Sequence, residues 1–311
     1  MSASASSHPW LPHCRPPIGS PGIPPSRFAA SIRTDSPEGC SFALLGMPDD
    51  LGVRLNSGRP GANDGPGAFR AALERYGVTQ TWWADLPRLF DAGDVVPAEG
   101  EDAAALAATH ERVSAAAAAL AAKGMTVIGI GGGHDLTYAL VRGVHRAHGH
   151  KTMSGLYFDA HLDVRDTPGS GMPFRKLVED GIVKNLRIVG FNPLVNLREH
   201  AAWFQGRGGT IAPPGAVSVG GLETTGSFVS VDLDSLDASA APGVSAPNPA
   251  GISASALTEQ MTILGQTYDL RCIDFMELCP AHDEGGRTAR LAAHLMLSYL
   301  YGVSRRGPSL R

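Results

Sequence analysis

From about residue 41 onward, short apolar runs alternate along the chain with longer helix-like stretches. The apolar runs predict strands at residues 42–47, 88–91, 125–130, 155–158, 186–189, 217–219, 228–231 and 271–275. The longer stretches predict helices at residues 66–76, 102–123, 136–148, 253–264 and 288–301. This alternation predicts an α/β fold with a mostly parallel sheet and helices on both faces. With no internal repeat and no second domain evident, residues 39–311 are expected to form one domain.

Histidines and aspartates follow three of the predicted strands. The predicted strand at residues 125–130 is followed by GGGH, the strand at 155–158 by DAHLD and the strand at 228–231 by DLD. Because ligand sites in α/β sheets lie at the carboxyl ends of parallel strands, we expect these side chains to meet in one cavity. Alternate residues of an extended segment also point the same way. The six candidate metal ligands are His134, Asp159, His161, Asp163, Asp232 and Asp234.

Two histidines and four carboxylates are too many ligands for one ion with an open position, and they suit two metals that share carboxylates. Mixed oxygen and imidazole donors suit Mn²⁺, and also Fe²⁺, Co²⁺, Ni²⁺ or Zn²⁺. Any one of these residues could instead be a helix cap or a solvated loop residue. Six of them at three strand ends favour a metal site, because buried carboxylates without a partner are costly. Metal-assisted hydrolysis of a C–N bond is the chemistry that we expect.

Three long loops are expected to border this cavity. Residues 165–174 and 237–251 each begin just after a ligand cluster, and residues 52–67 follow the first strand of the domain. Functional residues are commonly carried on loops that a rigid scaffold positions. We therefore expect these loops to cover the site and to contact the substrate.

The charge and the cysteines narrow the class of protein. The 311 residues carry a formal net charge of −4, with a pI of about 6.2, which gives no indication of nucleic acid or an anionic membrane as a partner. No apolar stretch reaches the roughly 20 residues of a membrane-spanning helix. The four cysteines are scattered and form no zinc-type or redox pair. We therefore expect a reducing, cytoplasmic compartment and no disulfides.

Residues 1–38 differ in composition from the rest of the chain. They are rich in serine, alanine and proline, and the first acidic residue is Asp35. Such a segment has too little apolar surface to order itself, so we expect a disordered extension. An organelle transit peptide also has an arginine- and serine-rich, acid-poor composition, although the repeated prolines oppose an amphipathic helix. An upstream misassigned start codon would give the same pattern.

The three motifs GGGH, DAHLD and SVDLD resemble the metal motifs of the ureohydrolases, a family that includes arginase, agmatinase and formimidoylglutamase. The resemblance extends from about residue 41 to residue 302. It implies an arginase-like three-layer α/β/α sandwich and two Mn²⁺ ions. It further implies roles for the six ligands: Asp159 and Asp232 would bridge the ions, His134 and Asp163 would complete one, and His161 and Asp234 the other.

The same resemblance implies a substrate-binding glutamate and a branch of the family. Glu277, in the segment MELCP, matches the glutamate that pairs with the cationic amidine-like end of the substrate. Arginases carry a proton-shuttling histidine about fifteen residues beyond the second motif, but none occurs here between His161 and His200. Residues 165, 170–174, 241–247 and 58–62 look like formimidoylglutamase. That branch hydrolyses N-formimidoyl-L-glutamate to L-glutamate and formamide, a step of histidine breakdown.

A dicarboxylate substrate needs cations or N–H donors. Arg165, Arg59 and Arg175 are the candidates, because guanidinium binds carboxylate in a bidentate fork, and Ser170 lies in the substrate loop. The alternative for each arginine is a surface or structural ion pair. Asp234 or a nearby water is expected to handle the proton in catalysis, with His282 as a weak substitute.

Three residues depart from the formimidoylglutamase pattern and leave other functions open. Met172 stands where that branch commonly has threonine, Asp135 where it has glutamate, and Cys279 where it has asparagine. None of these changes removes a metal ligand. The alternatives are a hydrolase of another guanidino or amidine compound, and a non-catalytic metal- or ligand-binding relative. Relatives with this fold often form homo-oligomers.

Overall fold

The computed structural model describes residues 10–17, 22–77, 79 and 86–307. In this part of the chain a single sheet contains nine strands in the order β1-β3-β2-β4-β9-β8-β5-β6-β7. All neighbouring strands are parallel except β1 and β3. The strands are β1 Cys14–Arg15, β2 Phe42–Met47, β3 Leu89–Val95, β4 Thr126–Gly131, β5 Met153–Phe158, β6 Val183–Val189, β7 Thr210–Ala212, β8 Thr225–Asp232 and β9 Asp269–Met276. The predicted mostly parallel α/β fold is confirmed.

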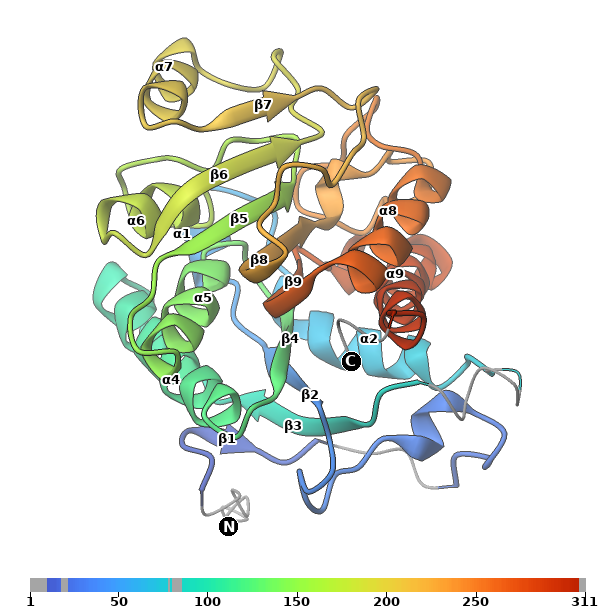
Figure 1. The fold of residues 1–311 in the computed structure, drawn as a ribbon. Coiled ribbons are helices and arrows are strands. Elements are labelled where there is room, and N and C mark those ends of the chain that lie inside the picture. Colours follow the sequence, from blue (N-terminus) through green and yellow to red (C-terminus); the bar gives the residue numbers. More distant parts are fainter. Residues whose placement is uncertain (1–9, 18–21, 78, 80–85, 308–311) are drawn as a thin grey trace.

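Eight α-helices in the described residues pack around this sheet. They are α1 Leu51–Leu55, α2 Gly65–Leu73, α4 Ala103–Ala121, α5 Leu136–Ala147, α6 Pro173–Glu179, α7 Arg198–Gly206, α8 Ala254–Thr267 and α9 Arg287–Ser304. In Figure 1 the helices α4, α5 and α6 lie on one side of the sheet, and α2, α8 and α9 lie on the other. No helix in the described ranges is long and apolar enough to cross a membrane.

Alternation of side chains along the central strands builds two cores, one on each face of the sheet. In β2, Phe42 and Leu44 belong to the core that includes residues of α2, α8 and α9. Ala43 and Leu45 of the same strand belong to the core that includes residues of α4, α5 and α6. Strands that are buried on both faces are expected to be apolar throughout, which is why they were evident in the sequence.

The structure differs from the prediction at the edge of the sheet beyond β6. Residues 217–219 were predicted to be a strand but form none, and the edge strand is β7, which pairs with β6 through Ala212 and Val189. Val219 is nevertheless buried, and its N–H donates to the side chain of Gln260 at 3.1 Å instead of to a strand. The segment is apolar because it packs against the core, not because it pairs.

The described parts of residues 1–38 pack on the body, which differs from the disorder expected for that extension. Strand β1 pairs antiparallel with β3 at the edge of the sheet, with Cys14 opposite Val95. Leu11, Cys14 and Phe28 are buried in the two cores. The composition averages over the segment and so hides these separated apolar side chains, each of which contacts the body individually.

Candidate metal centre

Four neighbouring strands in the middle of the sheet carry the site. They lie in the order β4, β9, β8 and β5 and are all parallel, so their carboxyl ends share one edge. At this edge His134 follows β4, Asp159 follows β5 directly, Asp232 is the last residue of β8, and Glu277 follows β9 directly. This is the edge at which open α/β sheets bind their ligands.

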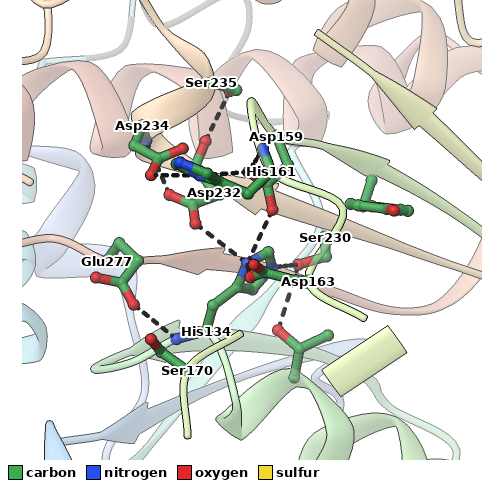
Figure 2. A network of polar contacts seen from close by, with 12 residues as sticks. His134, Asp159, His161, Asp163, Ser170, Ser230, Asp232, Asp234, Ser235 and Glu277 are labelled. Atoms are coloured by element: carbon green, nitrogen blue, oxygen red, sulfur yellow. Dashed lines mark hydrogen bonds and ion pairs between the residues drawn. The ribbon is translucent and has the colours of Figure 1, made fainter. Parts of the chain in front are cut away.

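The imidazole of His134 lies at the centre of a first cluster of carboxylates (Figure 2). Its Nδ1 atom is 3.2 Å from Asp159 Oδ2, 2.9 Å from Asp163 Oδ2 and 3.1 Å from Asp232 Oδ2. One nitrogen cannot donate to three oxygens at the same time. The four ligand atoms lie within 4.8 Å of one another, which is close enough for one cation to contact all of them.

A second cluster contains Asp159, His161 and Asp234. His161 Nδ1 is 3.4 Å from Asp159 Oδ1 and 3.2 Å from Asp234 Oδ2. Asp159 therefore faces both clusters, with one oxygen toward each histidine. Asp232 is grouped with the first cluster, and its Oδ1 atom accepts the backbone N–H of Asp234 at 2.8 Å. The structure thus brings all six predicted ligands into two adjoining sets that share Asp159.

The electrostatics of the clusters fit bound cations. Burial raises the pKa of Asp232, and the charges of Asp234 and Asp159 raise it further. Burial is also the main cause that raises the pKa of Asp234 to about 7. Burial alone would lower the pKa of His134, but the surrounding carboxylates raise it overall. Asp234 Oδ1 is buried and accepts no hydrogen bond from any described residue. The donor set therefore fits two divalent cations of the Mn²⁺ type, which prefer oxygen and imidazole ligands.

Side chains behind His134 hold its ring in place. On the far side of the ring, Nε2 is 3.0 Å from Ser230 Oγ, and that hydroxyl donates to Asp274 Oδ1 at 2.5 Å. Ser230 lies on β8 and Asp274 on β9, and both side chains are buried. A proton on Nε2 leaves Nδ1 with a lone pair for a cation, as is usual for metal-binding histidines. The sequence analysis did not identify Asp274, because it lies inside a strand and not at its end.

Glu277 lies beside the first cluster and has both carboxylate oxygens bound. Oε1 accepts the backbone N–H of His134 at 2.9 Å, and Oε2 accepts the hydroxyl of Ser245 at 2.7 Å. Burial and the nearby charge of Asp232 raise the pKa of Glu277 to about 8. The residue has a φ of +64°, which is a left-handed conformation uncommon for a side-chain-bearing residue. Such strain is characteristic of functional positions.

A cavity of about 230 Å³ opens over the clusters. Arg165 and Ser170 line it, together with Glu277 and four of the six candidate ligands. Its size suits a small molecule. The predicted substrate loop therefore meets the predicted metal site, as expected from their order along the chain.

The other two arginines proposed for the substrate do not line the cavity. Arg59 donates to the backbone carbonyls of Val244 and Ser245, at 2.6 and 2.8 Å. Arg175 donates to Glu179 at 2.9 Å, and its guanidinium lies 4.9 Å from the ring centroid of Trp203. Both guanidinium groups therefore have structural partners, which was the alternative considered for each. His282, the weak candidate for proton transfer, does not line the cavity either.

The cavity also contains residues that the sequence analysis did not identify as functional. Asn56, Ser245, Asn196 and His200 all line it. Asn56 follows α1, Ser245 lies in the loop before α8, Asn196 precedes α7, and His200 lies in the first turn of α7. Asn56 and Ser245 lie in loops that the sequence analysis expected to cover the site, but it assigned neither residue a role. Asn196 and His200 lie outside those loops and follow no predicted strand end, so no sequence signal pointed to them.

The chain is similar to known proteins over most of its length. A sequence model of the arginase family matches residues 40–302. The chain is 33% identical over 306 residues to a formimidoylglutamase from Aromatoleum aromaticum, covering 90% of this chain and 88% of the relative. It is also 33% identical over 276 residues to a formimidoylglutamase from Halobacterium salinarum, covering 84% and 87%.

Solved structures give the same result for the fold. Trypanosoma cruzi formiminoglutamase with Mn²⁺ superposes with a TM-score of 0.81 at 28% identity, covering 90% of this chain and 99% of that one. Proclavaminate amidino hydrolase from Streptomyces clavuligerus gives 0.77 at 24% identity, with 91% and 98% covered, which demonstrates the shared fold alone. The arginase-like three-layer fold is therefore confirmed. Because the family model covers most of the chain, this protein belongs to the arginase family.

Proposed function

We propose that this protein is a binuclear manganese hydrolase that cleaves N-formimidoyl-L-glutamate with water to give L-glutamate and formamide. The similarity to formimidoylglutamases over most of the chain supports this substrate. The observation that carries the proposal is one cavity that combines the histidine–carboxylate clusters, a buried glutamate and an arginine. The reaction would belong to histidine breakdown in the cytoplasm.

The proposed metal ligands are the residues of the two clusters. His134, Asp163 and Asp232 would hold one ion, His161 and Asp234 the other, and Asp159 would contact both. When bound, the two ions would activate water as a nucleophile and stabilise the negative charge that develops at the amidine carbon.

Glu277 and Asp234 have the proposed catalytic roles. A formimidoyl group is a planar cation with paired N–H donors, and the carboxylate of Glu277 can accept from it in a charge-assisted pair. Asp234 Oδ1 accepts no hydrogen bond from the described residues, and it would take a proton during hydrolysis. The amine of glutamate needs a proton when it leaves, and Asp234 would return to it the proton that it took.

Arg165 and Ser170 would bind the glutamate portion of the substrate. Arg165 donates to Asn56 and forms no ion pair with any described residue, so its charge is free to pair with a substrate carboxylate. Ser170 supplies a hydroxyl next to it. The substrate carboxylate would then lie at the exposed mouth of the cavity and the amidine at the buried metal end.

A second candidate is the hydrolysis of another amidine or guanidine that carries one carboxylate. The observation that favours it is that Arg165 is the one arginine among the described residues that line the cavity. A dicarboxylate would have to use neutral donors or His200 for its other carboxylate.

Product analysis distinguishes the two candidates. Purified protein loaded with Mn²⁺ would be given N-formimidoyl-L-glutamate, arginine and agmatine separately, with the Asp232→Asn variant as a control for a contaminating enzyme. Glutamate and formamide from the first compound alone would support the main proposal. Urea from either guanidine, or no turnover of formimidoylglutamate, would reject it.

A further inference from the structure

The segment after α1, residues 56–61, belongs to one of the three loops that border the cavity and contacts the other two. We call this segment the clamp loop. It includes Asn56, whose side chain carries one donor group and one acceptor and uses both. Asn56 Nδ2 donates to Ser170 Oγ at 3.2 Å, and Asn56 Oδ1 accepts from Arg165 Nη1 at 2.6 Å. The amide therefore fixes the relative positions of the two residues that are proposed to bind the substrate carboxylate.

Backbone hydrogen bonds hold the loop that carries Arg165, whose side chain is exposed. Its backbone N–H donates to the carbonyl of Gly171 at 2.8 Å, and the N–H of Ser170 donates to the carbonyl of Gly52 at 2.9 Å. A Cβ atom at Gly171 would lie 2.9 Å from Arg165 Cδ. Gly171 therefore lies against the arginine stem, and Asn56 bonds the charged end.

Near its other end, the clamp loop is connected to Glu277 through Ser245. The guanidinium of Arg59 donates to the carbonyls of Ser245 and Val244. Ser245 in turn donates its hydroxyl to Glu277 Oε2. Arg59 therefore lies outside the cavity but holds the backbone that carries a hydrogen-bond donor for the buried glutamate.

Two hydrogen bonds fix the end of the clamp loop to the rest of the protein. The N–H of Gly61 donates to Asp50 Oδ2 at 2.7 Å, which connects its end to the residue before α1. Cys279 Sγ donates to the carbonyl of Pro60 at 3.4 Å. Gly61 has a φ of +122°, and a Cβ atom there would lie 2.9 Å from Cys279 Sγ. A loop held at these points can fix the positions of residues in both of the loops that it contacts, 165–174 and 237–251.

We infer that the clamp loop positions both ends of the substrate site, Asn56 through Arg165 and Arg59 through Ser245. The inference rests on the proposed function for the identity of the ligand groups. Asn56 and Arg59 are positioning residues, since each acts through another side chain. The loop thereby connects the arginine proposed to bind the carboxylate with the glutamate proposed to bind the amidine.

The first arm of the test is Asn56→Ala, with Asn63→Ala as the matched control. Asn63 is exposed and its side chain bonds only its neighbour Asp64 among the described residues. Losing a hydrogen bond to a charged group is expected to raise KM for formimidoylglutamate about tenfold, with a much smaller change in kcat. In an Arg165→Ala background, Asn56→Ala should have little further effect, because the group that it positions is gone.

The second arm is Arg59→Ala, with Arg112→Ala as the matched control. Arg112 also donates to two backbone carbonyls, those of Val96 and Pro97, but it lies on α4. Arg59→Ala is expected to lower kcat/KM about tenfold and to add little in a Ser245→Ala background. If Arg59 had only a general structural role, the losses in kcat/KM from Arg59→Ala and Ser245→Ala would add up, and the effect of Arg59→Ala would be the same with or without the Ser245 hydroxyl.

Hydrogen exchange separates this inference from the proposed function. In Asn56→Ala the amides of Arg165 and Ser170 should exchange about tenfold faster than in the wild type, and in Arg59→Ala those near Ser245 should do so. Faster exchange with no turnover of formimidoylglutamate by the wild type would reject the proposed function and retain the positioning role. Exchange and KM equal to those of the two control variants would overturn the inference.

Discussion

Single residues carry most of the chemistry, and Glu277 gives a test that needs no substrate. Its folded pKa of about 8 lies above its ordinary value of 4.5, mainly because it is buried. Between these two pH values the folded protein keeps a proton that the unfolded chain has lost. The contribution to stability is therefore present at low pH and is lost as the pH rises through 8.

The metal-free protein should accordingly become less stable between about pH 4.5 and 8. Glu277→Gln removes the titrating group, so the free energy of unfolding should fall less steeply, by up to about 1.4 kcal/mol per pH unit. Thermal unfolding of chelator-treated protein across this range measures it. The exposed Glu99→Gln variant is the control. If the free energy of unfolding fell equally steeply with pH in Glu277→Gln and in the wild type, Glu277 would not be the group with the raised pKa.

The side chains behind His134 give a second prediction at this scale. Ser230→Ala removes the contact on Nε2 that orients the ring, so the affinity for Mn²⁺ should fall about 10- to 100-fold. Isothermal titration of the metal-free protein measures this. Ser227→Ala is the control, because Ser227 lies on the same strand but donates to the carbonyl of Glu223. Unchanged affinity in Ser230→Ala would mean that the ring is oriented by its carboxylates alone.

At the scale of residues, the sequence predicted which side chains gather in the two clusters but not the residues that support them. His134, Asp159 and Asp232 were evident because each follows or ends an apolar strand, which is a local pattern. Arg59 contacts Val244, which lies 185 positions away in the sequence. Since such pairings depend on how two loops fold over the sheet, the sequence indicated an arginine suited to a carboxylate but not its actual partner.

Helices and strands were likewise predictable where their sequence has a regular local pattern. The long helices and central strands were predicted because burial imposes a regular apolar pattern on them. The short helices α6 and α7 were not, because each has few residues and lies in a polar connection. Residues 217–219 were wrongly predicted as a strand because buried loops and strands can have the same apolar composition.

The turn that ends the clamp loop gives a prediction at this scale. Gly61→Ala places a Cβ atom in a conformation that disfavours side chains and against Cys279, so we expect a loss of roughly 1–3 kcal/mol. Gly67→Ala is the matched control, since a Cβ atom on that helical glycine meets nothing within 4 Å. The control should be neutral or stabilising by about 0.4–1 kcal/mol. Denaturant unfolding compares them, and equal stability of the two variants would show that the turn tolerates a side chain.

For the molecule as a whole, the three-layer architecture was predictable, but the N-terminal segment was not. Composition alone indicated disorder for residues 1–38, whereas Leu11, Cys14 and Phe28 are buried. Three apolar contacts spread over a proline-rich segment leave its average composition polar. The body provides the surface that these three side chains cover, so their burial depends on the folded domain.

The stability of the whole molecule should depend on metal. The two clusters bury several carboxylates together, and protons or cations must neutralise them. Ions that bind only the folded protein stabilise it by about 2.7 kcal/mol when present at 100 times their dissociation constant. The melting temperature should therefore rise with Mn²⁺ concentration and fall with a chelator, more at pH 8 than at pH 6, because fewer protons compete for the carboxylates. Asp159→Asn removes the ligand that both clusters share, so its melting temperature should respond only weakly to Mn²⁺, whereas the exposed Asp166→Asn variant should respond like the wild type. A wild-type protein whose melting temperature ignores both Mn²⁺ and the chelator would exclude metal as a partner of these clusters.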